Sequence, residues 1–207
     1  QALRRSLFKN ALTLTRNNGV VPVRGLDTLR IASLVIGDTL HCAFQQQLAR
    51  YARIDDFRCD KVLNADSANA LLSRLKPYDL VIASVHGTTF KVEKEFGIPQ
   101  ITLDFLRRLG DQNKMAFALF ANPYRLTQAY GAHRWGAVLC AYEENDDTQD
   151  LVAQALFGGI GVSGRLPVTA TSYFSQGRGL VLPAFDRLTY DLPEADKSKM
   201  DFGSGGN

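Results

Sequence analysis

The 207-residue sequence has no long hydrophobic run and little cysteine or histidine. No stretch approaches the roughly 20 consecutive apolar residues of a transmembrane helix, so no membrane span is expected. The three cysteines, Cys42, Cys59 and Cys140, are far apart and odd in number, which argues against a disulfide framework and favours buried free thiols. The three histidines lack the close spacing of a local metal motif, although this spacing says nothing of a cluster made by the fold. We expect no metal.

The sequence also lacks a block of like charge, an initiator methionine and the apolar core of a signal peptide. Its net charge of +3 is dispersed, so no nucleic-acid partner is predicted. A helix-like start without methionine suggests a fragment or a processed product. With 45% hydrophobic residues, the chain can build one sizeable core.

Apolar runs of strand length alternate with segments of helical periodicity. This alternation predicts an α/β protein: a three-layer α/β/α sandwich of flavodoxin- or Rossmann-like build, with a mostly parallel sheet of five to six strands. Strands are expected near residues 30–37, 57–63, 78–85, 114–122 and 136–142, with a short closing strand at 166–169. Helices are expected near residues 2–16, 40–52, 66–75, 101–109 and 147–156.

One glycine-rich stretch, Gly159-x-Gly161-x-x-Gly164, has the spacing of a dinucleotide-binding loop. A phosphate-binding loop needs a strand before it and a helix after it, because the helix N-terminus supplies free amides. Here a helix precedes the loop and a strand is expected to follow. We therefore interpret the glycines as a helix cap and a tight turn, and expect no cofactor.

Nucleophile and carboxylate motifs are also weak. No Gly-x-Ser-x-Gly is present, and Ser84 is best explained as a core serine at the end of a strand. An acidic group at residues 143–147 follows a strand, where glycosidase carboxylates would be placed, but a solvated loop and a helix cap explain it more simply.

The most suggestive single residue is His86, which comes directly after a strong strand and begins a long loop. Ligand sites of open α/β sheets lie at the carboxyl ends of strands. Glu93 and Glu95 lie on the same loop and could reach a neighbouring site. A structural histidine and solvated loop charges are the simpler alternatives.

Two separated motifs resemble the C-terminal domain of family 3 glycoside hydrolases. Residues 11–23, ALTLTRNNGVVPV, are similar to the segment that leads into that domain. ALFGG at 155–159 and SGRLPVT at 163–169 are similar to its closing signature, and DLVIASVHG at 79–87 fits a central strand. The resemblance covers residues 2 to about 190 and is stronger toward bacterial β-N-acetylglucosaminidases than toward β-glucosidases.

The resemblance implies a division of the chain into three parts. Residues 1–25 would be a leading helix and extended segment from a missing upstream domain, and residues 26–190 the α/β sandwich. Residues 191–207 would be a linker or tail, similar to the connector that joins some relatives to a β-lactamase-like domain.

The resemblance also implies that the catalytic machinery lies elsewhere. In this family the nucleophilic Asp belongs to an upstream TIM-like barrel, and the acid/base is a barrel His or, in β-glucosidases, a Glu of the C-terminal domain. Only Glu93 and Glu95 are available here, so no catalytic residue is assigned; with His86 they are candidates for positions near the substrate.

The expected function is therefore that of a non-catalytic or accessory domain of a β-glycosidase. It would shape the cleft beside the barrel, with carbohydrate at the domain interface, and would be inactive alone. The family resemblance suggests the periplasm or cell envelope. Two alternatives stay open: a free-standing flavodoxin-like module that binds a small ligand near Gly37 and His86, and a purely structural spacer.

Overall fold

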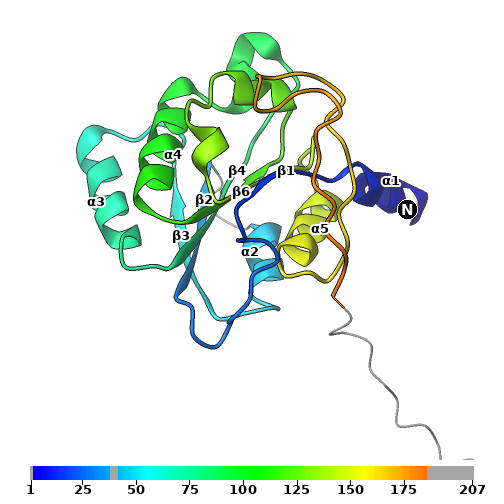
Figure 1. Ribbon diagram of the computed structural model, residues 1–207. Helices are drawn as coiled ribbons and strands as arrows, with labels where there is room; N and C mark the ends of the chain where they lie inside the picture. The colour runs from blue at the N-terminus through cyan, green and yellow to red at the C-terminus, as the bar shows by residue number, and fades with distance from the viewer. Residues whose placement is uncertain (1, 38–41, 186–207) are drawn as a thin grey trace, which may run out of the picture.

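The computed structural model describes residues 2–37 and 42–185, which form a sheet between two layers of helices (Figure 1). Within these residues one six-stranded sheet has the order β1-β6-β5-β4-β2-β3. Only β1 runs antiparallel to its neighbour. The expected three-layer sandwich with a mostly parallel sheet is confirmed. The strands are β1 (Thr13–Asn17), β2 (Ile31–Ile36), β3 (Ile54–Cys59), β4 (Leu80–Val85), β5 (Met115–Leu119) and β6 (Ala137–Cys140).

The helices divide between the two faces of the sheet. They are α1 (Ala2–Ala11), α2 (Ala43–Leu48), α3 (Ala65–Leu75), α4 (Gln100–Gln112) and α5 (Asp146–Leu156). Alternate residues of β2 show the division, because Leu34 belongs to the core beneath α3 and α4, whereas Val35 belongs to the core beneath α2 and α5. Burial on both faces explains why the central strands read as continuous apolar runs.

The expected helix over residues 2–16 is wrong beyond Ala11. Residues 13–17 form β1, which pairs antiparallel with β6 at one edge of the sheet. The β-branched Thr13 and Thr15 favour an extended chain and are fully buried, so tertiary pairing outweighs the helical spacing of the leucines.

Several predicted boundaries shift for identifiable reasons. The weak strand expected at 57–63 lies at Ile54–Cys59, on the opposite edge of the sheet, where its charged residues face solvent. Helix α4 does not end at Gly110 but continues to Gln112. The glycine is needed for packing, because a Cβ there would lie 2.4 Å from Trp135. The caps of α3 and α5 are Asn64 and Asn145, each two residues before the position, 66 or 147, at which the helix was expected to begin.

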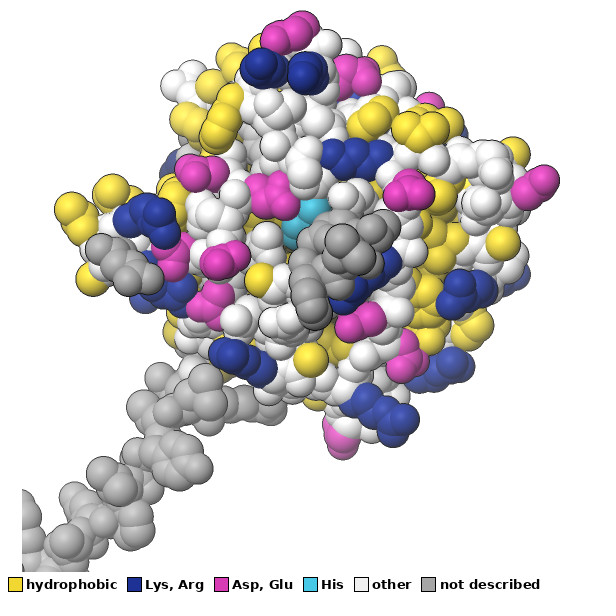
Figure 2. All heavy atoms as spheres, turned by 180° about the vertical axis from the view of Figure 1, so that it is seen from behind, with side chains coloured by type: hydrophobic (Ala, Val, Ile, Leu, Met, Phe, Trp, Pro, Cys, Tyr) yellow, Lys and Arg dark blue, Asp and Glu magenta, His cyan; other side chains and the backbone are white. Residues whose placement is uncertain are grey.

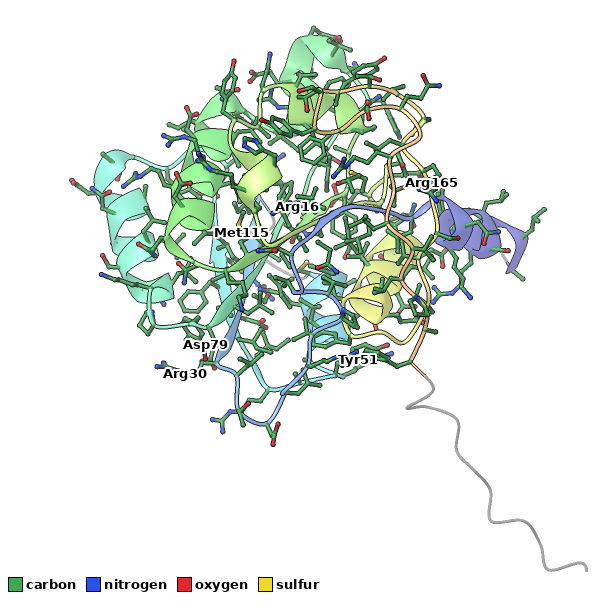
Figure 3. All side chains as sticks on the ribbon, in the orientation of Figure 1. Arg16, Arg30, Tyr51, Asp79, Met115 and Arg165 are labelled. Atoms are coloured by element: carbon green, nitrogen blue, oxygen red, sulfur yellow. The ribbon has the colours of Figure 1, made fainter. Side chains whose placement is uncertain are left out.

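The amino end of the sheet is closed by polar contacts. The backbone amide of Arg30 donates to the Asp79 carboxylate at 2.8 Å, and the amide of Asp79 donates to the carbonyl of Arg30 at 2.9 Å. The two residues lie next to each other below the start of β2 and β4 (Figure 3).

The prediction of a closing strand at 166–169 is wrong. The last described segment instead makes isolated antiparallel bridges, between Leu14 and Leu180 and between Val162 and Leu182. The expected tail at 191–207 and the first two residues of the helix expected at 40–52 lie outside the described residues. No helix in the described part of the chain is long and apolar enough to cross a membrane.

Candidate functional site

The carboxyl end of the sheet contains a topological switch point between β2 and β4. From β2 the chain passes to β3 on one side, whereas β4, β5 and β6 extend on the other. Crevices at such points are the usual ligand sites of open α/β sheets. Gly37 and His86 are the first residues beyond the two strands, and the His86 amide donates to the carbonyl of Ile36 at 2.8 Å. The structure therefore places His86 at the position that sequence reasoning favoured.

The side chain of His86 points into the protein rather than toward solvent. Only 1% of its surface is exposed, and its ring packs against Phe120 with ring centroids 5.3 Å apart. Its Nε2 lies 2.9 Å from the hydroxyl of Ser84, and its Nδ1 lies 3.0 Å from a carboxylate oxygen of Glu144. His86 is thus a buried imidazole with a partner at each ring nitrogen.

Glu144 reaches His86 from the loop after β6. This loop turns sharply at Tyr142, whose φ of 67° lies in the left-handed region. The second carboxylate oxygen of Glu144 accepts a hydrogen bond from the Thr88 amide at 2.9 Å, and the Thr88 hydroxyl lies 3.1 Å away. The Glu144 side chain retains 22% exposure, so the pair joins the interior to the surface.

Both groups of this pair are charged near neutral pH. Burial alone would lower the pKa of His86, but hydrogen bonds with Cys42 and Glu144 outweigh it and raise the pKa to about 9. Burial would raise the pKa of Glu144, yet the bonds from His86 and the Thr88 amide lower it to about 2. The result is an imidazolium–carboxylate ion pair that connects β4 to the β6–α5 loop across β5.

Ser84, His86 and Glu144 have the hydrogen-bond order of a catalytic triad. Ser84 nevertheless lies inside β4 and is 0% exposed, so no substrate carbonyl reaches its hydroxyl. The interpretation of Ser84 as a core serine is confirmed. Cys42, whose sulfur is 3.7 Å from Nε2 of His86, is 1% exposed. The network orients His86 and holds the loop, and does not form a nucleophilic centre.

A lysine from the end of β3 closes the other side of the switch point. Lys61 donates from its Nζ to the carbonyl of Gly87 at 2.7 Å, and partial burial lowers the pKa of its ammonium group. Gly37 has a φ of 91°, and a Cβ there would lie 2.4 Å from Lys61 and 2.9 Å from the carbonyl of His86. One face of the molecule shows a histidine side chain at its centre, with acidic side chains beside it (Figure 2).

The other two candidates are not joined to His86. Glu93 and Glu95 lie in the 3₁₀ segment η1 (Val92–Gly97), and both are exposed. Glu95 has a φ of 51° and lies 3.4 Å from the buried guanidinium of Arg125. The structure thus pairs Glu95 with Arg125 and His86 with Glu144, in two separate ion pairs.

Sequence reasoning missed Glu144, which it attributed to a solvated loop. It lies four residues past the end of β6, and His86 directly follows the end of β4. Parallel strands bring such residues to the same edge of a sheet. The missing information was the strand order, because β4 and β6 are separated by β5.

The apparent dinucleotide loop has a purely structural explanation. Gly158, with a φ of 79°, ends α5, and no helix follows the glycines as far as residue 185, where the described part of the chain ends. A Cβ on Gly164 would lie 2.4 Å from the carbonyl oxygens of both Ala11 and Leu12. This glycine therefore permits the last segment to lie against the chain that enters β1. Among the described residues, no group of three or more metal-ligating side chains is close enough to hold an ion.

Comparison with solved structures finds this fold within larger glycosidases. The chain is similar to part of a fungal multi-domain family 3 β-N-acetylglucosaminidase, with 16% identity and a TM-score of 0.64 over 83% of this chain and 19% of that one. A family 3 β-N-acetylglucosaminidase from Paenibacillus sp. strain FPU-7 matches with 14% identity and a TM-score of 0.63, over 82% and 32%. A β-glucosidase from Listeria innocua, solved with isofagomine, matches with 15% identity and a TM-score of 0.59, over 78% and 26%.

These likenesses confirm, at the level of fold, the resemblance to family 3 glycoside hydrolases. The chain spans about a fifth to a third of the length of these enzymes, so the structural neighbours contain other parts besides this fold. No protein-family model matches the sequence, and no curated protein does.

Proposed function

We propose that the chain is the accessory α/β-sandwich domain of a family 3 β-glycosidase, which hydrolyses O-glycosyl bonds in β-N-acetylglucosaminides or β-glucosides. The observation that carries this proposal is the shared fold, which covers 78–87% of this chain but only 19–35% of the glycosidases. A free-standing ligand-binding module is not favoured by these neighbours. The catalytic barrel would be another part of the natural protein.

The accessory role is supported by the state of the buried acid and base. A general acid must hold a proton at the working pH and reach the glycosidic oxygen. Glu144, with a pKa of about 2, holds no proton near neutral pH. His86 is protonated but 1% exposed and bonded on both nitrogens. In the described part of the chain, this network therefore supports a positioning role.

The surface beside this network favours contact with another domain. Phe90 and Val92 lie on the segment that follows β4 and are 71% and 70% exposed. Apolar side chains that are exposed close together commonly mark interaction surfaces. We propose that the segment from Thr88 to Gly97 packs beside the substrate cleft of the barrel, with Glu93 and Glu95 near its rim.

The proposal is tested in the natural protein that carries this chain. Glu93→Gln and Glu95→Gln would be compared with wild type on p-nitrophenyl β-N-acetylglucosaminide and β-glucoside, with Asp66→Asn on α3 as a distant control. An accessory role predicts altered KM with kcat within a few-fold of wild type. A general acid contributes about 10²–10⁴-fold, so a loss of that size in kcat for one variant would overturn the accessory role.

The domain arrangement has its own test. The gene that encodes the chain should also encode a barrel upstream, with an Asp nucleophile. If that Asp is replaced by Asn, turnover should fall by several orders of magnitude. A gene product without a barrel would contradict the proposal directly.

A further inference from the structure

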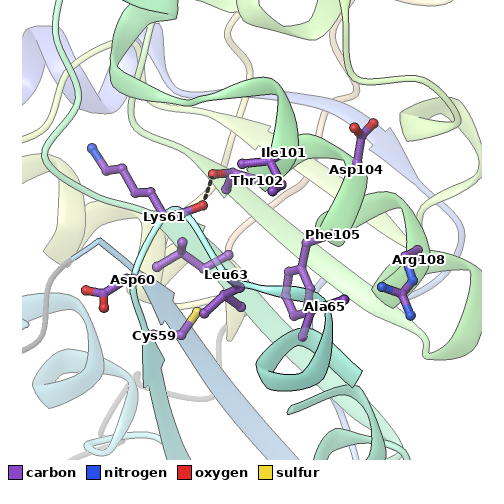
Figure 4. A pocket seen from close by; sticks show the side chains of 12 residues that line it. Cys59, Asp60, Lys61, Leu63, Ala65, Ile101, Thr102, Asp104, Phe105 and Arg108 are labelled. Carbon is purple, nitrogen blue, oxygen red and sulfur yellow. Dashed lines mark hydrogen bonds between the residues drawn. The ribbon is translucent and has the colours of Figure 1, made fainter. Parts of the chain in front are cut away.

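A cavity of about 190 Å³ lies between α3 and α4, beside the end of β3 (Figure 4). It lies on the face of the sheet where Val85 and Phe105 share the core beneath α3 and α4. The Ser84–His86 network lies on the opposite face, beneath α2 and α5. Nothing in the proposed glycosidase function uses this cavity.

The walls of the cavity are mainly apolar and come from three elements. Ala68 comes from α3, and Ile101 and Phe105 come from α4. Cys59 ends β3, and Leu63 follows it in the loop before α3 (Figure 4). Phe105 and Ala68 are each 6% exposed, whereas Ile101 is 45% exposed, so the cavity has an apolar interior and is open to solvent on one side. A hollow with such walls is poorly suited to water, which needs two to four polar partners.

Three polar side chains at the rim, those of Thr102, Asp104 and Arg108, have partners within the protein. The Thr102 hydroxyl donates to the carbonyl of Lys61 at 2.6 Å. A carboxylate oxygen of Asp104 accepts a bond from Gln100 at 3.2 Å, and Arg108 donates to Asn69. The described buried polar atoms that lack a partner belong to Gln47, Trp135 and Asn145, and none of these residues lines the cavity. Among the described residues, no buried polar atom that lines the cavity lacks a partner.

We infer that this cavity is a binding site for a small neutral aromatic molecule of single-ring size. A closed apolar cavity of about 150 Å³ accommodates benzene, so about 190 Å³ admits a ring with one or two small substituents. Phe105 offers a ring for edge-to-face contact, and Cys59 offers a polarisable sulfur, which interacts well with aromatic rings. The small volume excludes drug-sized ligands, which need about 300 Å³ or more.

Cys59 provides a reporter inside the site. It is the one cysteine that is partly exposed, since Cys42 and Cys140 are buried, and all three lie in the described residues. Burial raises the pKa of the Cys59 thiol to about 12, so this wall is neutral at ordinary pH. A ring bound beside the thiol would block its reaction with maleimide.

The test uses toluene as the probe and two matched alanine variants of α3. Ala65 and Ala70 are both exposed, but only Ala65 lines the cavity. Ala65→Phe would fill the cavity mouth from outside, whereas Ala70→Phe adds the same ring on another face of the helix. At toluene concentrations tenfold above its Kd, labelling of Cys59 by N-ethylmaleimide should slow about tenfold in wild type and Ala70→Phe, with a rise in Tm. Ala65→Phe should show neither effect.

Three outcomes would overturn the inference. One is an unchanged labelling rate and Tm of folded wild type at saturating toluene. Another is equal protection in Ala65→Phe, which would show that toluene binds elsewhere. If Ala65→Phe fails to fold, intermolecular NOEs in wild type decide: contacts from toluene to the Ala68 methyl and the Phe105 ring support the site, and their absence rejects it.

Discussion

The Nδ1 atom of His86 lies 3.0 Å from Oε1 of Glu144, a residue 58 positions further along the chain. One partner follows β4 and the other follows β6, so the ion pair holds together the carboxyl ends of two strands that are not neighbours. It fixes the loop after β6 at the edge where ligand sites of this fold lie. The pair is therefore where the stability of the domain and the shape of its candidate site are linked.

Removal of the carboxylate from this pair should destabilise the protein. Glu144→Gln leaves a buried imidazole without its counter-charge, and broken buried pairs cost about 3–5 kcal/mol. Because Glu144 is partly exposed, we expect a loss of about 2–3 kcal/mol in the free energy of unfolding at pH 6. Urea denaturation measures it, and the neighbouring Glu143→Gln is the control, which should change stability by less than about 0.5 kcal/mol. Equal stability of the two variants would contradict the role of the pair.

The pair also predicts a pH dependence with a defined sign. Folding raises the pKa of His86 from 6.5 to about 9, so its stabilisation is complete below pH 6.5 and is lost as the pH rises through 9. Folding lowers the pKa of Glu144 from 4.5 to about 2, so stabilisation is complete above pH 4.5 and is lost as the pH falls toward 2. Both shifts describe one interaction. Stability should therefore be greatest between about pH 5 and 6.5.

The measurement is the free energy of unfolding between pH 5 and 9.5 in wild type and Glu144→Gln. Wild type should lose about 2–3 kcal/mol more than the variant over the alkaline limb. A histidine NMR titration supplies the second readout, in which the His86 ring should titrate near pH 9. A ring that titrates near pH 6.5 would show that the imidazolium pair does not form.

The glycine-rich stretch predicts a contrast between two of its members. Gly164→Ala would place a methyl group 2.4 Å from two backbone carbonyls, which leaves no flexible group to move aside. At Gly159 the nearest atom is 3.4 Å away, in ordinary contact range. We expect Gly164→Ala to cost at least about 2 kcal/mol and Gly159→Ala less than about 1 kcal/mol, as measured by thermal unfolding. Neither wild type nor Gly159→Ala should bind NAD in calorimetry, and binding would restore the cofactor interpretation.

Attachment of α1 should depend on salt. None of its residues is buried, and its leucines Leu3 and Leu7 are 75% and 60% exposed. Arg4 donates to Asp147 at 2.8 Å, and Arg5 pairs with Asp150 of α5. Exposed ion pairs weaken as salt increases. Hydrogen exchange of the α1 amides should therefore be faster in 1 M than in 0.05 M NaCl, while exchange in β4 stays the same.

The sequence predicts the layered fold because the buried strands have unmistakable apolar runs, such as Leu80–Val85. It fails at β1, because the pairing of Thr13 with Cys140 is a contact between residues far apart, and the local leucine spacing indicated a helix. For the same reason, the sequence predicts one member of the buried ion pair and misses the other. His86 stands out by its place after a strand, but its partner Glu144 becomes recognisable only when the strand order is known.

The proposed function is that of an accessory domain whose catalytic partner lies elsewhere in the natural protein. The most direct measurement is the turnover of p-nitrophenyl β-N-acetylglucosaminide and β-glucoside by the folded 207-residue chain alone, beside the natural full-length protein at equal molar concentration. We predict turnover by the full-length protein and none above the buffer rate by the chain. Robust turnover by the chain alone would contradict the account, because it would place a complete catalytic centre within these residues.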